Sequence, residues 1–239
     1  MNENLSKLKK LLLDFYNTVP LHNLWLLEGE RKNKDESLGG TCTDKTLYFH
    51  KIISQEGFYF RLHNAFINNE PCHRVLLGNF DGKNCLLDVG DGAPLIEPFF
   101  FNENKEHSFF GFDYIQKSDD NLFELFIMKP NGPSLSFFAT NEIIPEHIIH
   151  KKIIEDFQNT SINPFHITLR FSKVVGNKFY RIENNILKIG SEKGIEKKEI
   201  TSLSELEILF KNIFQFNFDF VIRGIDILKN RNIILFKDY

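Results

Sequence analysis

The first sixty residues carry apolar side chains at the spacing of helices. Between positions 5 and 16, leucine, phenylalanine and tyrosine recur three and four residues apart, and Pro20 closes this pattern. A second stretch with helical spacing runs from Cys42 to about Gly57. The N-terminal part of the chain is therefore predicted to be mainly helical.

The patterns of the middle and of the last third are those of strands. Strands are predicted, in chain order, at 58–62, 75–77, 85–87, 122–128, 167–175, 178–182 and 186–189. The first and the fourth alternate between apolar and polar residues, as in half-buried strands. The second and the third are wholly apolar, which is typical of strands buried on both faces.

The C-terminal part mixes the two kinds of element. Ser202 is followed three residues later by Glu205, which is the pattern of a capping box and predicts the start of a helix. Its apolar stripe ends at Ile213, and the tail up to 233–236 is predicted to be β-rich. The mixed charges at 28–34 indicate a linker. The predicted order of elements is helical, then β, then mixed.

Composition narrows the class of protein. Of the 239 residues, 42% are apolar and 26 are Phe, which supplies a core and excludes a disordered chain. The 29 basic and 32 acidic side chains, a net charge of −3, argue against a nucleic-acid partner. No apolar run approaches the ~20 residues that span a bilayer. The N-terminus lacks a secretory pattern, and three cysteines are too few for a disulfide framework. A soluble, cytoplasmic protein with no membrane partner is expected.

One short segment concentrates candidate chemistry. Gly39-Gly40-Thr41-Cys42 places a thiol directly after a glycine pair, at the predicted start of a helix. Glycines permit unusual backbone angles and close approach, and a helix N-terminus favours the thiolate over the thiol. Cys42 is therefore a candidate nucleophile, although a small buried residue near a turn would leave the same local pattern.

A predicted hairpin supplies two partners for this thiol. His73 lies at the entry to the second predicted strand and Asp88 follows the third, with the turn Asp81-Gly82-Lys83-Asn84 between them. Antiparallel pairing would bring Asp88 beside His73, where the carboxylate would fix the imidazole tautomer and the imidazole would activate Cys42. Taken singly, His73 also fits a structural strand-end residue and Asp88 a turn residue.

Together, these segments resemble the arylamine N-acetyltransferase family. That family has, in this order, an Arg-Gly-Gly-X-Cys motif, a Thr-His-X-Val strand and an Asp-Val-Gly-Phe-Gly turn, which correspond here to 38–42, 72–75 and 88–92. The segment 19–24 is similar to the one before the family's nucleophile, and 159–165 to the one that leads into its third domain. The chain is identified as a shortened, divergent member.

Four positions depart from the family's pattern. Leu38 replaces the arginine of the glycine motif, and Cys72 replaces the threonine before the histidine. Thr43 stands where the family has an aromatic residue after the cysteine, and Asp91 where it has the phenylalanine of its Asp-Val-Gly-Phe-Gly turn. That phenylalanine helps form the family's acceptor pocket, so Asp91 is expected to make the pocket more polar and to add a second carboxylate near the chemistry.

The resemblance implies an α+β fold in three parts. It comprises an N-terminal helical bundle with the nucleophile at 1–56, a central β-barrel with the histidine and aspartate at 57–158, and a C-terminal α/β lid at 159–239. The core would be similar to that of cysteine proteases and transglutaminases. The protein is expected to be a monomer or a homodimer.

The same resemblance implies a ping-pong acetyl transfer. Cys42, activated by His73 and Asp88, would take the acetyl group from acetyl-CoA and pass it to a small arylamine, hydrazine or hydroxylamine. Gly90 and Gly92 would contact the CoA pyrophosphate, and Thr43 and Asp91 would contact the acceptor. No metal is expected, because no two cysteines form a Cys-X-X-Cys pair.

Two other functions keep the same residues. An amide-forming or transglutaminase-like enzyme would use the same Cys-His-Asp order with a different acyl donor. A catalytically silent relative would bind a ligand without turnover, and the departures at Leu38, Thr43 and Asp91 motivate this second alternative. Donor preference separates the first alternative from acetyl transfer, and replacement of Cys42 separates the second.

Overall fold

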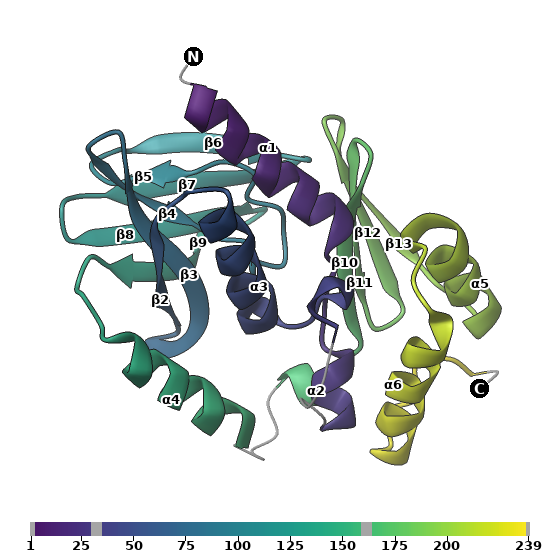
Figure 1. Ribbon diagram of the computed structural model, residues 1–239. Helices are drawn as coiled ribbons and strands as arrows, with labels where there is room; N and C mark the ends of the chain where they lie inside the picture. Colours follow the sequence, from purple (N-terminus) through teal and green to yellow (C-terminus); the bar gives the residue numbers. More distant parts are fainter. Residues whose placement is uncertain (1–2, 30–34, 159–163, 238–239) are drawn as a thin grey trace.

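The computed structural model describes residues 3–29, 35–158 and 164–237 (Figure 1). Most of the linker predicted at 28–34 lies outside these ranges, as does most of the segment 159–165. Within them, no helix is both long enough and apolar enough to cross a membrane.

Helices occupy the first part of the chain, as its apolar spacing predicts. They are α1 (Glu3–Thr18), α2 (Leu24–Glu28) and α3 (Cys42–Gln55), with a 3₁₀ turn, η1 (Glu36–Leu38), before α3. α1 and α3 meet through buried rings, since those of Phe15 and Phe49 lie 4.8 Å apart. This contact anchors the helix that begins at Cys42 to the core.

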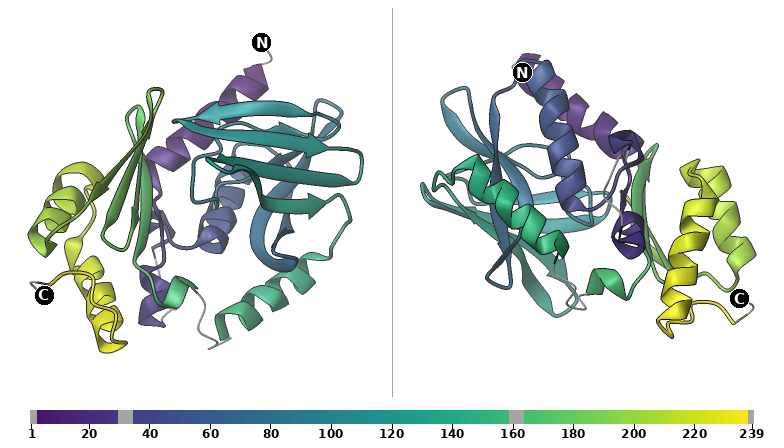
Figure 2. Two further views of the ribbon diagram at one scale, coloured as in Figure 1. Left: turned by 180° about the vertical axis from the view of Figure 1, so that it is seen from behind. Right: turned by 60° about the horizontal axis from the view of Figure 1, so that its bottom comes forward.

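An eight-stranded antiparallel sheet forms the middle of the chain, in the order β5-β4-β3-β2-β9-β8-β7-β6. Its strands are β2 (Phe60–Ile67), β3 (Glu70–Phe80), β4 (Lys83–Leu87), β5 (Phe99–Phe100), β6 (Lys105–Phe109), β7 (Phe112–Ser118), β8 (Leu122–Lys129) and β9 (Gly132–Thr140). The sheet curls strongly (Figures 1 and 2). The predicted central barrel is therefore a half-barrel. An unpredicted helix, α4 (Glu146–Gln158), packs near β2.

A smaller antiparallel sheet combines a short strand from the N-terminal part of the chain with four strands from the C-terminal part. Its order is β1 (Leu21–His22), β10 (Arg170–Val175), β11 (Lys178–Glu183), β12 (Ile186–Ser191) and β13 (Gly194–Glu199). β1 comes from the segment just before Cys42 and pairs with β10, with Leu21 opposite Ser172. The approach to the candidate nucleophile is thus tied to the C-terminal sheet.

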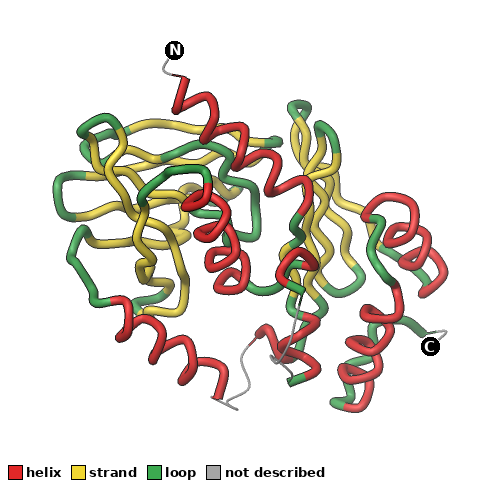
Figure 3. Tube along the Cα trace, in the orientation of Figure 1, coloured by secondary structure: helices red, strands yellow, loops and turns green. Residues whose placement is uncertain are grey.

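The prediction of a β-rich tail is wrong. After η2 (Pro164–His166) and the small sheet, the chain forms α5 (Leu203–Ile208), a π-helical continuation η3 (Leu209–Phe214) and α6 (Phe218–Asn230). The segment 233–236 is loop (Figure 3). In α6 the buried residues recur three and four apart, a helical period that outweighs the β preference of the individual residues. These are Phe218, Val221, Gly224, Ile225 and Leu228.

Two apolar cores support the two sheets. The larger lies between α1, α3 and the curled sheet, and the smaller joins α2, β10–β12 and the C-terminal helices. Figure 2 shows those helices on the outer side of the small sheet, so that its other side faces the curled sheet. The fold therefore leaves an interface between the two sheets in which a site can form.

Phe49→Ala is expected to destabilise the protein by about 3–5 kcal/mol, because it removes a fully buried ring from the inner face of α3 and leaves a cavity. Urea denaturation measures the change in the free energy of unfolding. The control is Tyr59→Ala, because Tyr59 is 89% exposed and loss of its side chain should change stability by less than about 0.5 kcal/mol. Equal, small effects of the two changes would contradict this packing.

Candidate active site

Two glycines turn the chain into the helix that carries Cys42. Gly39 and Gly40 have φ angles of +83° and +154°, and a side chain on Gly39 would clash with the Pro20 carbonyl. The Gly40 N–H donates to that carbonyl (3.3 Å), and the Gly40 carbonyl accepts from the His22 N–H (2.8 Å). Gly39 is required because the Pro20 backbone packs directly against it, and Gly40 because a side chain there would meet the Asp44 carboxylate.

Cys42 is the first residue of α3, as the sequence predicts. The Asp44 carboxylate accepts hydrogen bonds from the Thr41 backbone N–H (2.9 Å) and hydroxyl (2.8 Å), which closes the first turn. The Cys42 side chain is partly exposed. The thiol is therefore held at a fixed helix N-terminus and remains accessible.

The predicted hairpin forms between β3 and β4, with Leu76 opposite Leu87. Its turn uses positive φ angles of 51° at Asp81 and 80° at Gly82. Just beyond the paired residues, His73 Nε2 donates to Asp88 Oδ2 over 2.8 Å. The strand register thus brings together the two residues that the sequence analysis paired.

The Asp88 carboxylate is fully buried and fully hydrogen-bonded. Its Oδ1 accepts from the backbone N–H groups of Gly90 (2.7 Å) and Asp91 (3.2 Å), while Oδ2 accepts from His73. The Tyr16 hydroxyl donates to the Asp88 carbonyl oxygen (3.0 Å). Because each oxygen has a donor, the carboxylate can hold its charge and its orientation without water.

The electrostatic interactions between Cys42 and His73 favour the thiolate form of Cys42. Burial raises the pKa of Cys42, but a hydrogen bond from His73, the positive charges of His73 and Arg74, and the Thr43 hydroxyl outweigh it, so that this pKa lies below its usual value. Burial lowers the pKa of His73, whereas Asp88 and Cys42 together raise it well above its usual value. With Nε2 committed to Asp88, Nδ1 is left to face Cys42.

Cys42 and His73 open into a cleft of about 680 Å³ between the two sheets. Six of the seven residues predicted for the site line it, namely Cys42, Thr43, His73, Gly90, Asp91 and Gly92. The seventh, Asp88, is buried behind His73. The cleft therefore brings residues from three separate motifs to one place.

The two glycines of the loop after β4 allow close approaches. A Cβ on Gly90 would lie 2.6 Å from the Cβ of Cys42, and one on Gly92 would lie 3.0 Å from Nη1 of Arg181. Gly90 thus lets the loop rest against the nucleophile, and Gly92 lets the small sheet reach the loop. The predicted contact of both glycines with a CoA pyrophosphate stays a prediction.

Thr43 and Asp91, the two polar replacements predicted to contact an acceptor, both line the cleft. The Thr43 hydroxyl lies 4.0 Å from the Cys42 sulfur. The Asp91 carboxylate accepts from the Ser136 hydroxyl (3.1 Å) and from the Ala93 backbone N–H (3.2 Å). Burial and the neighbouring Asp88 raise the pKa of Asp91, against the opposing effect of His73 and these hydrogen bonds.

Sequence reasoning missed the basic residues of the opposite wall. Arg170 on β10 and Arg181 on β11 line the cleft, and Glu183 lies 3.2 Å and 3.3 Å from their guanidinium groups. No local motif marks these arginines, since the small sheet is far along the chain from Cys42. The only signal was a charged residue within a strand-like run.

A buried lysine beneath the site was also missed. Lys45, three residues after Cys42, is 1% exposed. Its ammonium donates to the Val19 carbonyl (3.0 Å) and lies 4.5 Å from the ring centre of Tyr16. Burial lowers the pKa of Lys45 to about 7, although the nearby Asp88 carboxylate raises it.

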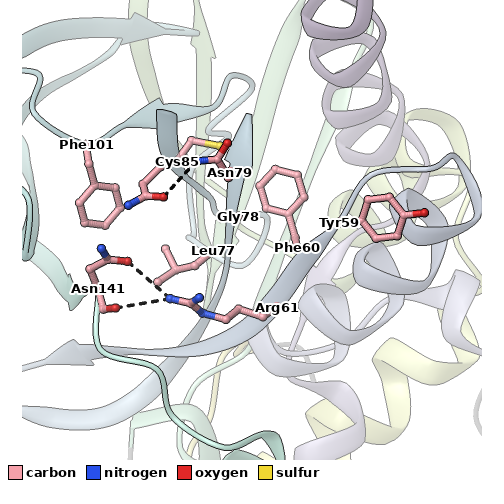
Figure 4. A pocket seen from close by; sticks show the side chains of 10 residues that line it. Tyr59, Phe60, Arg61, Leu77, Gly78, Asn79, Cys85, Phe101 and Asn141 are labelled. Atoms are coloured by element: carbon pink, nitrogen blue, oxygen red, sulfur yellow. Dashed lines mark hydrogen bonds between the residues drawn. The ribbon is translucent and has the colours of Figure 1, made fainter. Parts of the chain in front are cut away.

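A second hollow, of about 350 Å³, shares no lining residue with the cleft (Figure 4). Arg61 Nη2 donates there to the backbone and side-chain oxygens of Asn141, both at 3.4 Å. Burial raises the pKa of Cys85, which also lines this hollow, to about 12, so that thiol stays protonated. Among the described residues, no group of three or more His, Cys, Asp or Glu could hold a metal ion.

Comparison with known proteins bears on this arrangement. No protein-family model and no curated protein matches the sequence. Solved structures do match, and three arylamine N-acetyltransferases are among them. For the Mycobacterium abscessus protein the TM-score is 0.76, with 15% identity over 94% of this chain and 88% of that one. For the Salmonella typhimurium protein the TM-score is 0.73, with 16% identity over 87% of this chain and 83% of that one. For the Mycobacterium marinum protein in complex with CoA the TM-score is 0.73, with 16% identity over 96% of this chain and 93% of that one.

The chain has the arylamine N-acetyltransferase fold. The resemblance inferred from the three motifs is thereby confirmed at the level of the fold, and the low identities agree with a divergent sequence. The α+β class is confirmed as well. The implied likeness of the core to cysteine proteases and transglutaminases stays a prediction.

Gly90→Ala is expected to slow alkylation of Cys42 at least about tenfold, because the new methyl group would displace the loop or the nucleophile by close contact with Cys42. Mass spectrometry of the Cys42 peptide after brief iodoacetamide treatment measures the rate. Gly29→Ala is the control for general loss of stability, since it strains a positive φ but meets no atom within 4 Å. Equal rates in wild type and Gly90→Ala would contradict the packing.

His73→Ala is expected to move the midpoint of Cys42 alkylation to higher pH. In the wild type His73 holds the pKa of the Cys42 thiol below its usual value; without His73, burial is the largest remaining influence and raises this pKa. The thiolate then exists only at higher pH, so the rate at neutral pH falls. A pH series of iodoacetamide labelling, read at the Cys42 peptide in a Cys72→Ser background, measures the shift. An unchanged midpoint would rule out the pairing.

Proposed function

We propose that the protein transfers an acetyl group from acetyl-CoA to a small amine through a thioester on Cys42. The proposal rests on one observation: a thiol at a helix N-terminus, an imidazole and a buried carboxylate converge at a cleft in this fold. A solved structure with the same fold is a complex with CoA, which supports an acyl-CoA donor.

The first half-reaction loads the nucleophile. The Cys42 thiolate attacks the carbonyl carbon of the thioester, and a C–S bond forms to Cys42. The oxyanion would accept from the backbone N–H of Cys42 at the start of α3. When the bond to CoA breaks, the departing sulfur takes a proton from the His73 imidazolium, and Asp88 keeps the neutral imidazole in the tautomer needed next.

The second half-reaction transfers the acetyl group from Cys42 to the amine. A neutral amine attacks the acetyl carbon of S-acetyl-Cys42, the new C–N bond replaces the C–S bond, and Cys42 leaves as a thiolate. His73 takes the proton that the amine nitrogen gives up. The thiolate–imidazolium pair favoured by the electrostatics of the free site is thereby restored.

The donor would lie along the cleft toward the small sheet. Gly90 and Gly92 allow the loop after β4 to pack closely against Cys42 and Arg181. Arg170 and Arg181 place positive charge on the facing wall of the cleft, where they would bind phosphates. We further propose the division at 1–56, 57–158 and 159–239, in which the first part holds the nucleophile, the second its partners and the third this basic wall. Cytoplasmic location and a monomeric or homodimeric state stay predictions.

Brief exposure to acetyl-CoA without an acceptor is expected to add one acetyl group to the wild type and none to Cys42→Ala, as measured by intact mass. Cys72→Ser, which removes the other cysteine of the cleft, should still gain the group. Absence of the adduct would point to another acyl donor or to a protein without turnover. An adduct on Cys42→Ala would overturn Cys42 as the nucleophile.

A further inference from the structure

We infer that the acceptor is a protonated aliphatic amine, and that Asp91 binds its ammonium group and takes its first proton. This inference rests on the proposed function and narrows its acceptor from the predicted arylamines, hydrazines and hydroxylamines. It assigns to Asp91 a role separate from those of Cys42, His73 and Asp88. Three observations support it: the position of Asp91, its set of partners and the chemistry of amines.

Asp91 lines the cleft into which Cys42 opens. It follows Gly90, whose Cα is so close to Cys42 that a Cβ there would lie 2.6 Å from the Cys42 Cβ. Asp91, Cys42 and His73 line the same cleft, and the charge of His73 lowers the pKa of Asp91. A nucleophile approaching an acyl group on Cys42 therefore comes within the field of the Asp91 carboxylate.

The Asp91 carboxylate is oriented but its charge is not paired. Its hydrogen-bond donors are the neutral Ser136 hydroxyl and Ala93 N–H. Within the described ranges no lysine or arginine forms an ion pair with it, and the nearby Arg181 pairs with Glu183. A partly buried anion without a cationic partner is costly. A ligand that brings an ammonium group would supply the missing partner.

The remaining surroundings make Asp91 a better base than an ordinary aspartate. Burial and the adjacent negative charge of Asp88 raise its pKa. A carboxylate with a raised pKa accepts a proton more readily, which is the property needed to deprotonate an ammonium group. Asp88 cannot take this role, because His73 and two backbone N–H groups already occupy its oxygens.

Amine chemistry explains why a second carboxylate is needed. An alkylamine, like the lysine side chain, keeps its proton to about pH 10 and has no free lone pair at neutral pH. An arylamine is already neutral there and needs no such base. In the inferred step the ammonium gives one proton to Asp91, the freed lone pair attacks the acetyl carbon, the C–S bond breaks with its electrons on Cys42, and the second N–H proton goes to His73. Charge balances at every stage.

The test compares benzylamine with aniline, which share a ring but differ in whether the nitrogen is protonated at neutral pH. Cys42 is first acetylated, with acetyl-CoA in one arm and with p-nitrophenyl acetate in the other, and loss of the acetyl group is then followed by intact mass after each amine is added. The proteins are the wild type, Asp91→Asn and Glu70→Gln. Glu70 is a second carboxylate of the same cleft, so its amide variant is the matched control.

The expected result is that wild-type acetyl-enzyme reacts faster with benzylamine than with aniline. Asp91→Asn should reduce the benzylamine-to-aniline rate ratio by about tenfold or more, and Glu70→Gln should not. Faster reaction of the wild type with aniline, or an equal slowing of both amines by Asp91→Asn, would overturn the inference; the wild-type comparison needs no variant to fold. Acetylation by p-nitrophenyl acetate but not by acetyl-CoA would overturn the proposed donor alone. Acetylation by neither would overturn both proposals.

Discussion

The hydrogen bond from His73 to the buried Asp88 carboxylate sets the conditions for the whole site. A carboxylate without access to water is stable only when its oxygens have donors, and here the His73 ring supplies one while the loop after β4 supplies two. Because these donors come from two places, the register of the β3–β4 hairpin and the path of the loop are both constrained. The charge kept at Asp88 raises the pKa of His73, which in turn holds the Cys42 pKa low.

The second constraint is close approach of backbones. Gly39 lies against the Pro20 carbonyl and Gly90 against Cys42, so three chain segments meet with no room for a Cβ at either contact. The segment that contains Pro20 continues into β1, which pairs with β10. The nucleophile, its histidine and the wall of the small sheet are therefore joined by main-chain contacts, which keep the cleft in one shape more firmly than side-chain packing alone would.

The parts of this site that could be predicted from the sequence depend on residues close together along the chain. The hairpin and the pairing of His73 with Asp88 followed from a four-residue turn between two apolar runs, and the position of Cys42 from a glycine pair before a helical pattern. Ser136, Arg170 and Arg181 reach the cleft from strands whose placement depends on the tertiary fold, so no spacing along the chain could relate them to Cys42. In the fold, the error at the C-terminus had a different cause. The phenylalanines, isoleucines and valine of α6 favour strands individually, and only their period shows the helix.

The buried ionisable groups around the nucleophile carry charges of both signs. Cys42, Asp88 and Asp91 are negative when ionised, and His73, Arg74 and Lys45 are positive when protonated. Each anion influences at least one of these cations. Moving a proton within such a set leaves its net charge unchanged, which avoids the cost of creating a lone charge away from water. A cationic acceptor adds one charge at Asp91, the only one of the three anions with neither a histidine nor an arginine as its direct partner, and this is where the set can accommodate it.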